Sequence, residues 1–129
     1  MKNIVWLMVL GAVFFVILSS CSPALTLTNQ DAGRSVDVKL GDTIMITLDA
    51  NPTTGYTWEV APDVRTSLRL AGQPTYTASQ PVMTGSGGKM TFRFTAVTAG
   101  ETSLKLIYHR PWEVDVAPAQ IFTLQVNVK

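Results

Sequence analysis

The chain has 129 residues, enough for a single domain, and 47% of them are hydrophobic. Ten Lys and Arg residues stand against nine Asp and Glu, so no basic excess exists to attract nucleic acid. The sequence has one histidine, one cysteine and no cluster of either, so we expect no metal site and no cofactor.

The N-terminal segment is typical of a secretory signal. Lys2 precedes an apolar run over residues 4–18, and Ser19 and Ser20 follow it. At fifteen residues the run is shorter than the roughly 20 that a membrane-spanning helix needs. A retained anchor helix is the alternative interpretation, but the length favours a signal.

The residues that end this segment sharpen the prediction. The run from Leu18 to Cys21 resembles a bacterial lipobox, which implies a lipoprotein signal peptide at residues 1–20 and lipidation of Cys21. Lipidation also accounts for an odd cysteine in an exported protein. Under this resemblance, Ser22 in place of an aspartate after the cysteine implies sorting to the outer membrane of a Gram-negative cell. We therefore expect an exported protein, lipid-anchored in the cell envelope with its domain on the periplasmic or surface face.

The domain at residues 22–129 has no other cysteine, so its fold must rest on a hydrophobic core without disulfides. From Leu25 onward, short segments alternate apolar and polar residues, and no stretch keeps a helical period of 3.6. A further short strand is expected at 67–71, and Trp58 is expected in the core. The predicted inward sets are Val36, Val38 and Leu40; Ile44, Ile46 and Leu48; Met90, Phe92, Phe94 and Ala96; Leu104, Leu106 and Tyr108; and Phe122, Leu124, Val126 and Val128.

Seven or eight such strands, separated by Gly and Pro, predict an all-β fold: an immunoglobulin-like antiparallel β-sandwich. No cysteine pair brackets Trp58, so an antibody-type domain is excluded.

The residues of the loop that follows the strand expected at 43–50 constrain its backbone strongly. Pro52 fixes its own φ and favours an extended Asn51, while Gly55 permits a positive φ. Thr53 and Thr54 between them are stiff at χ1 and carry small hydroxyls. Such a loop is pre-shaped and has no means of chemistry of its own.

Two other connections have unusual composition. One is glycine-rich at residues 84–89, and the other runs from His109, expected to be a solvated strand end, to Glu113. Counting strands places the three loops at the B–C, D–E and F–G connections, which lie at one end of an immunoglobulin-like sandwich. The sequence therefore predicts one contiguous binding surface.

Taken in order, the three loops are similar to those of the chagasin family of cysteine peptidase inhibitors, over roughly residues 25–129. The resemblance implies an immunoglobulin-like fold and tight, reversible inhibition of papain-like cysteine peptidases, with the loops as a wedge across the active-site cleft. The residues implied to bind the peptidase are Asn51, Pro52, Thr53, Thr54, Gly55 and Tyr56; Met83, Thr84, Gly85, Ser86, Gly87 and Gly88; and Arg110, Pro111 and Trp112.

Under this resemblance each loop has a role. The first loop would cover the catalytic Cys–His pair, and the glycines of the second would lie close along the unprimed part of the cleft. Trp112 would be an aromatic anchor on the primed side, with Arg110 pairing with a carboxylate or bracing the loop. The chain departs from the family before the glycine-rich motif, where a bulky apolar residue is common and Thr84 stands here after Met83. The resemblance leaves open whether Met83 or Thr84 meets the specificity pocket of the peptidase.

Other functions have weaker support. The glycine-rich segment lacks the first glycine and the Ser or Thr of a phosphate-binding loop, because Met83 and Met90 occupy those positions. No G-x-S-x-G element surrounds Ser86, so an enzyme is not expected. The alternative is a lipid-anchored binding module for an envelope protein or a carbohydrate. In either case we expect a monomer that contacts the lipid membrane through Cys21.

Overall fold

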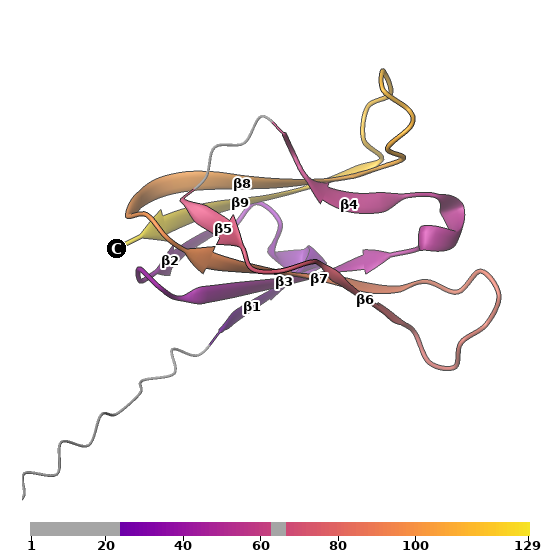
Figure 1. The fold of residues 1–129 in the computed structure, drawn as a ribbon, viewed down its shortest axis with the longest axis horizontal. Helices are drawn as coiled ribbons and strands as arrows, with labels where there is room; N and C mark the ends of the chain where they lie inside the picture. The colour runs from indigo at the N-terminus through magenta and orange to yellow at the C-terminus, as the bar shows by residue number, and fades with distance from the viewer. Residues whose placement is uncertain (1–23, 63–66) are drawn as a thin grey trace, which may run out of the picture.

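The computed structural model describes residues 24–62 and 67–129, which form two packed β-sheets (Figure 1). The predicted signal peptide and Cys21 lie outside these residues. The first sheet has the order β1 (Leu25–Thr28), β3 (Thr43–Ala50), β7 (Gly88–Ala96) and β5 (Leu68–Leu70), and β6 (Thr75–Ala78) also pairs with β7. The second has the order β2 (Ser35–Val38), β9 (Gln120–Val128), β8 (Gly100–His109) and β4 (Thr57–Val60). Two 3-10 turns, η1 (Asn29–Asp31) and η2 (Pro52–Thr54), complete the elements.

The predicted all-β immunoglobulin-like sandwich is confirmed, with two refinements. The described residues form nine strands rather than seven or eight. The sheets are mixed rather than purely antiparallel, because β1 runs parallel to β3 and β2 runs parallel to β9. The chain supplies β1 to the edge of one sheet and then crosses through η1 to the edge of the other. Alternation in a sequence reports which face a residue occupies, and it carries no information about strand direction.

The core lies between the sheets and consists mainly of the predicted inward sets. The buried members include Ile44, Ile46, Leu48, Phe92, Phe94, Leu104, Leu106, Phe122, Leu124 and Val126. Trp58 is also buried, and its indole Nε1 donates to the Asp49 carbonyl at 2.9 Å. Leu40 is an exception: β2 ends at Val38, so Leu40 lies in the following turn and is 57% exposed.

Sequence reasoning missed β6, a four-residue segment without the large aliphatic side chains that mark the predicted inward sets. All four of its residues are exposed or half-buried. The strand is defined by its pairing with β7, where Thr75 lies opposite Thr91 and Ala78 lies opposite Gly88.

The two ends of the sandwich differ in what they carry. The β3–β4, β6–β7 and β8–β9 loops lie toward one end, on the right of Figure 1, and β1 begins at the other. The register agrees, since Leu25 lies beside Ile44 at the start of β3, whereas the first loop follows Ala50 at its end. No helix within the described ranges is long and apolar enough to cross a membrane.

Candidate functional site

The β3–β4 loop is a single 3-10 turn closed by its own side chains. Pro52 starts the turn, and Gly55 ends it at a φ of 84°, the positive value that the sequence predicts. The Thr53 hydroxyl donates to Asn51 Oδ1 at 2.6 Å, and the Thr54 hydroxyl donates to the Asn51 carbonyl at 2.6 Å. Both hydroxyl protons are therefore used within the loop, which holds its shape without a partner.

The turn is also tied to the core below it. The backbone N–H of Asn51 donates to the hydroxyl of Tyr108 at 2.9 Å. Tyr108 is buried, and its ring stacks on Tyr56 with centroids 5.3 Å apart and lies 5.0 Å from that of Trp58. The sequence predicts Tyr108 only as a core residue, because alternation does not reveal that its hydroxyl reaches the loop.

Arg110 joins the β8–β9 loop to the β3–β4 loop. Its Nε donates to the Thr54 carbonyl at 3.1 Å, one terminal nitrogen pairs with Glu113 Oε1 at 3.0 Å, and the guanidinium lies 4.5 Å from the centre of the Tyr56 ring. The hydrogen bond to Glu113 raises the pKa of Arg110 above its ordinary value. Sequence reasoning missed Glu113, although its position three residues after Arg110 is a signal for such a pair.

Trp112 makes the second junction between these loops. Its side chain is 66% exposed, yet its ring lies directly over Gly55. A Cβ added at Gly55 would collide with Trp112 Cη2 and lie 3.1 Å from Cζ2. Gly55 is therefore needed twice, for its positive φ and for the space that the indole occupies.

The β6–β7 loop is a tight turn with an apolar tip. The Ser86 hydroxyl donates to the Met83 carbonyl at 2.7 Å, the Met83 N–H donates to that hydroxyl at 3.1 Å, and Gly85 has a φ of 77°. One side-chain hydrogen bond links this loop to the first, from Asn51 Nδ2 to the Gly85 carbonyl at 3.1 Å. Thr84 is exposed, and Val82 and Met83 are 66% and 65% exposed.

Gly87 and Gly88 approach their own domain closely. A Cβ at Gly87 would lie 2.9 Å from the Ala50 carbonyl oxygen, and one at Gly88 would collide with the backbone of Thr77. Gly88 is buried as the first residue of β7. In the free domain the base of this loop therefore packs against β3 and β6.

The three loops form one edge with a polar centre and apolar flanks. Ten large hydrophobic side chains are exposed among the described residues, and five of them lie on the β6–β7 and β8–β9 loops. These five are Val82, Met83, Trp112, Val114 and Val116. The β3–β4 loop between them presents Pro52, Thr53 and Thr54 to solvent. Such a surface suits contact with another protein more than chemistry on a small molecule.

His109 differs from its predicted role as a solvated strand end. Its side chain is only 21% exposed, and Nε2 lies 2.9 Å from Glu59 Oε2. The pairing of β4 with β8 places Thr57 opposite His109 and so brings Glu59 within reach. Within the described residues, no group of three or more His, Cys, Asp and Glu side chains is placed to hold a metal ion.

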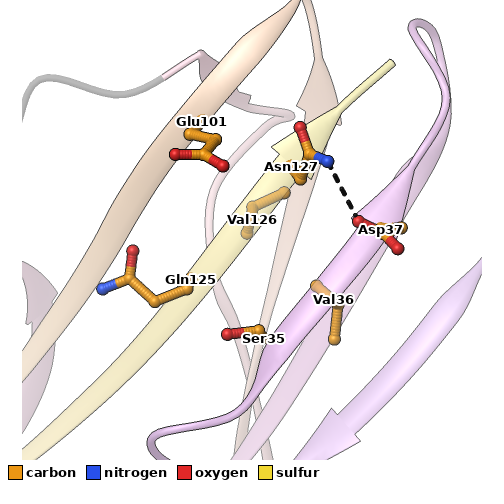
Figure 2. Close-up of a pocket in the computed structure, with 7 residues that line it drawn as sticks. All are labelled: Ser35, Val36, Asp37, Glu101, Gln125, Val126 and Asn127. Atoms are coloured by element: carbon orange, nitrogen blue, oxygen red, sulfur yellow. Dashed lines mark hydrogen bonds between the residues drawn. The ribbon is translucent and has the colours of Figure 1, made fainter.

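A polar hollow of about 310 Å³ lies on the outer face of β2, β8 and β9 (Figure 2). Asn127 Nδ2 donates to Asp37 Oδ1 at 3.1 Å across it, and the strand register places Glu101 on the other side of Asn127. The hollow lies near the start of β8, whereas the β8–β9 loop follows its end. This site is therefore separate from the loop edge.

A sandwich with three braced loops at one end defines a protein-binding module. The model of the Chagasin family peptidase inhibitor I42 matches residues 37–126. Amoebiasin-1 of Entamoeba histolytica is 35% identical over 107 residues, covering 81% of this chain and 100% of that protein, and Chagasin of Trypanosoma cruzi is 28% identical over 103 residues, covering 78% and 94%. The solved structure of the cysteine protease inhibitor EhICP2 from E. histolytica has a TM-score of 0.68 at 29% identity, covering 82% of this chain and 96% of that one.

The chain belongs to the chagasin family of peptidase inhibitors. The predicted family is thereby confirmed. The similar solved structures include cysteine protease inhibitors, among them EhICP2. Members of the family are protease inhibitors rather than enzymes, as the sequence predicts for this chain.

Proposed function

We propose that this protein is a tight, reversible inhibitor of papain-like cysteine peptidases that occludes the active-site cleft with its three loops. The bracing of these loops carries the proposal. Arg110 holds Thr54, Trp112 covers Gly55, and Asn51 holds Gly85. Because the loops are ordered before binding, docking costs little conformational entropy, which favours high affinity.

The shape of the central loop supports blockage without cleavage. A papain-like site cleaves an extended peptide with a thiolate activated by a histidine. The β3–β4 loop is instead a closed turn, in which the Thr54 N–H donates to Asn51 O at 3.2 Å and the Gly55 N–H donates to Pro52 O at 3.0 Å. The turn would fill the cleft over the catalytic pair while offering no extended carbonyl for attack.

The flanking loops would supply anchors on either side. Trp112 is an exposed aromatic held by Gly55, as expected for a binding hot spot. On the other flank, Met83 offers a long apolar side chain that is 65% exposed, and we assign it rather than Thr84 to the specificity pocket. The Thr84 side chain is shorter and carries a hydroxyl that an apolar pocket would have to desolvate.

We also propose that lipidated Cys21 anchors the protein in the outer membrane. Only residues 22–24 separate Cys21 from β1, a reach of about 11 Å. Since β1 begins at the end of the sandwich opposite the loops, the anchored domain would point its loops away from the bilayer. The eight residues of β3 alone span about 27 Å between the two ends.

The test is a titration of an active papain-like peptidase with residues 22–129, which contain every strand of the described fold. We expect stoichiometric loss of activity, recovery on dissociation and an uncleaved domain. Trp112→Ala is expected to weaken inhibition about 100-fold. Leu40→Ala, an exposed apolar residue in the β2–β3 turn, is the matched control and should change nothing. A folded domain that leaves the peptidase active would contradict the proposal.

A further inference from the structure

The β8–β9 loop continues its apolar surface past Trp112. Val114 is 87% exposed, the highest value among the exposed large hydrophobic residues, and Val116 is 59% exposed. Single exposed apolar residues are normal on protein surfaces, but three within five residues of one loop form a patch. The residue between Trp112 and Val114 is Glu113, whose carboxylate is turned back to Arg110.

A hollow of about 390 Å³ lies between this part of the loop and the outer face of β4 and β8. Its apolar lining includes Val60, Ile107, Pro111, Val114, Val116 and Pro118. The carboxylates in its lining each have a partner: Glu59 Oε2 lies 2.9 Å from His109 Nε2, and Glu113 Oε1 lies 3.0 Å from a terminal nitrogen of Arg110.

The pairing of these charges decides what the hollow suits. An apolar group entering it would remove water without leaving an unpaired charge. A small polar ligand would find few free groups to orient it, whereas ligand sites typically present several convergent polar groups. The hollow is therefore matched to an apolar side chain carried on a larger body.

We infer that Val114 and the hollow beneath it form a second contact with the peptidase. The hollow would receive an apolar side chain from a part of the enzyme surface that lies beyond the part in contact with Trp112. This inference rests on the proposed function. Continuity of the loop carries it: Trp112 faces the β3–β4 loop through Gly55, and Val114, two residues later, lines the hollow. A body seated against Trp112 is thus brought close to Val114.

The contact would act on selectivity. It lies beyond the central turn, on the outer side of the sandwich, so it meets enzyme surface away from the catalytic pair. Val114 would add affinity for peptidases with an apolar side chain at that place and nothing for those without one. It is a specificity-determining residue and leaves the blocking turn unchanged.

The experiment compares residues 22–129 with the variants Val114→Ser and Val97→Ser against a panel of papain-like peptidases. Val97 is the same residue type, 41% exposed, in the β7–β8 turn away from the loop edge. We expect Val114→Ser to raise the inhibition constant about tenfold for at least one peptidase and less than twofold for another. Val97→Ser should stay within twofold of the unmodified domain for all of them.

Three results would overturn the inference, and they can be told apart. If Val114→Ser stays within twofold of the unmodified domain on every inhibited peptidase, the second contact is absent while the proposed function stands. If the unmodified domain inhibits none of them, the proposed function fails first. If Val114→Ser abolishes a dimer seen by sedimentation and leaves inhibition unchanged, the hollow binds a second copy of the chain instead.

Discussion

The β3–β4 and β8–β9 loops are locked to each other, whereas the tip of the β6–β7 loop is held mainly by its own turn. The locked pair shares the Arg110–Thr54 hydrogen bond, the Arg110–Tyr56 stack and the Trp112–Gly55 contact. Among the described residues, one side-chain hydrogen bond, from Asn51, reaches the β6–β7 loop. The difference indicates separate roles for the locked loops and the freer tip in binding. Under the proposed function, the contacts that lock the pair would give affinity common to all targets, whereas the freer β6–β7 tip, and Val114 beyond the locked contacts, would set the choice among them.

This division has a physical basis. A contact between two prearranged loops already exists in the free domain, so binding the peptidase carries no further entropy cost for ordering it. A tip with two exposed apolar side chains can adjust to pockets of different shape, and methionine is well suited to that because its side chain is flexible.

The largest effect is expected from breaking the locked pair with Gly55→Ala. The new Cβ would strain the positive φ and displace the Trp112 ring, so we expect inhibition to weaken about 100-fold. Gly72→Ala is the matched control, since Gly72 has a φ of 76° with nothing within 4 Å of an added Cβ. Equal inhibition by both variants would show that the Trp112 contact has no role.

Arg110→Ala is expected to weaken inhibition about tenfold, because it removes the hydrogen bond to Thr54, the ion pair with Glu113 and the stack on Tyr56. Arg110→Lys keeps the charge but loses the planar fork, so it should recover little of the loss. Inhibition constants and melting temperatures of both variants would be compared. Full recovery with lysine would mean that Arg110 acts only through its charge.

Met83→Ala tests the freer tip and should have a smaller effect that depends on the target. We expect about a fivefold loss against peptidases with a large apolar specificity pocket and almost none against those with a small one. Thr84→Ala is the control. A uniform loss across a panel would place Met83 in the shared part of the interface.

The smallest effect is expected from Asn51→Asp, about threefold. The new carboxylate can still accept a hydrogen bond from Thr53, but it cannot donate one to the Gly85 carbonyl. The link to the β6–β7 loop is therefore lost while the β3–β4 turn is kept. Slower association with unchanged melting temperature is the expected result. A loss as large as that of Gly55→Ala would show that all three loops are locked alike.

Much of the fold is predictable because buried positions repeat with the period of a strand. The sets around Ile46, Phe92 and Leu124 are buried as predicted, and Gly55 adopts its predicted positive φ. Counting the predicted strands along an immunoglobulin-like sandwich also places the three loops at one end. These features depend on local patterns that neighbouring residues encode.

Other features depend on contacts between distant segments and escape prediction. The exposure of Leu40 follows from where β2 ends, and the His109–Glu59 pair follows from the register of β4 against β8. Gly88 is packed against Thr77 of β6, a four-residue strand without a buried side chain. The Arg110–Thr54 bridge joins residues 56 positions apart, and only the assembled sandwich brings them together.

Hydrogen exchange of residues 22–129, free and bound to an inhibited papain-like peptidase, tests the central claim most directly. The three-loop account predicts new protection at residues 51–56, 82–87 and 110–116, with the hollow between β2 and β9 unchanged. The smallest change is expected in the β3–β4 turn, because the N–H groups of Asn51, Thr54 and Gly55 are already bonded in the free domain. Protection centred on β2 and β9, with the three loops exchanging as before, would contradict the account.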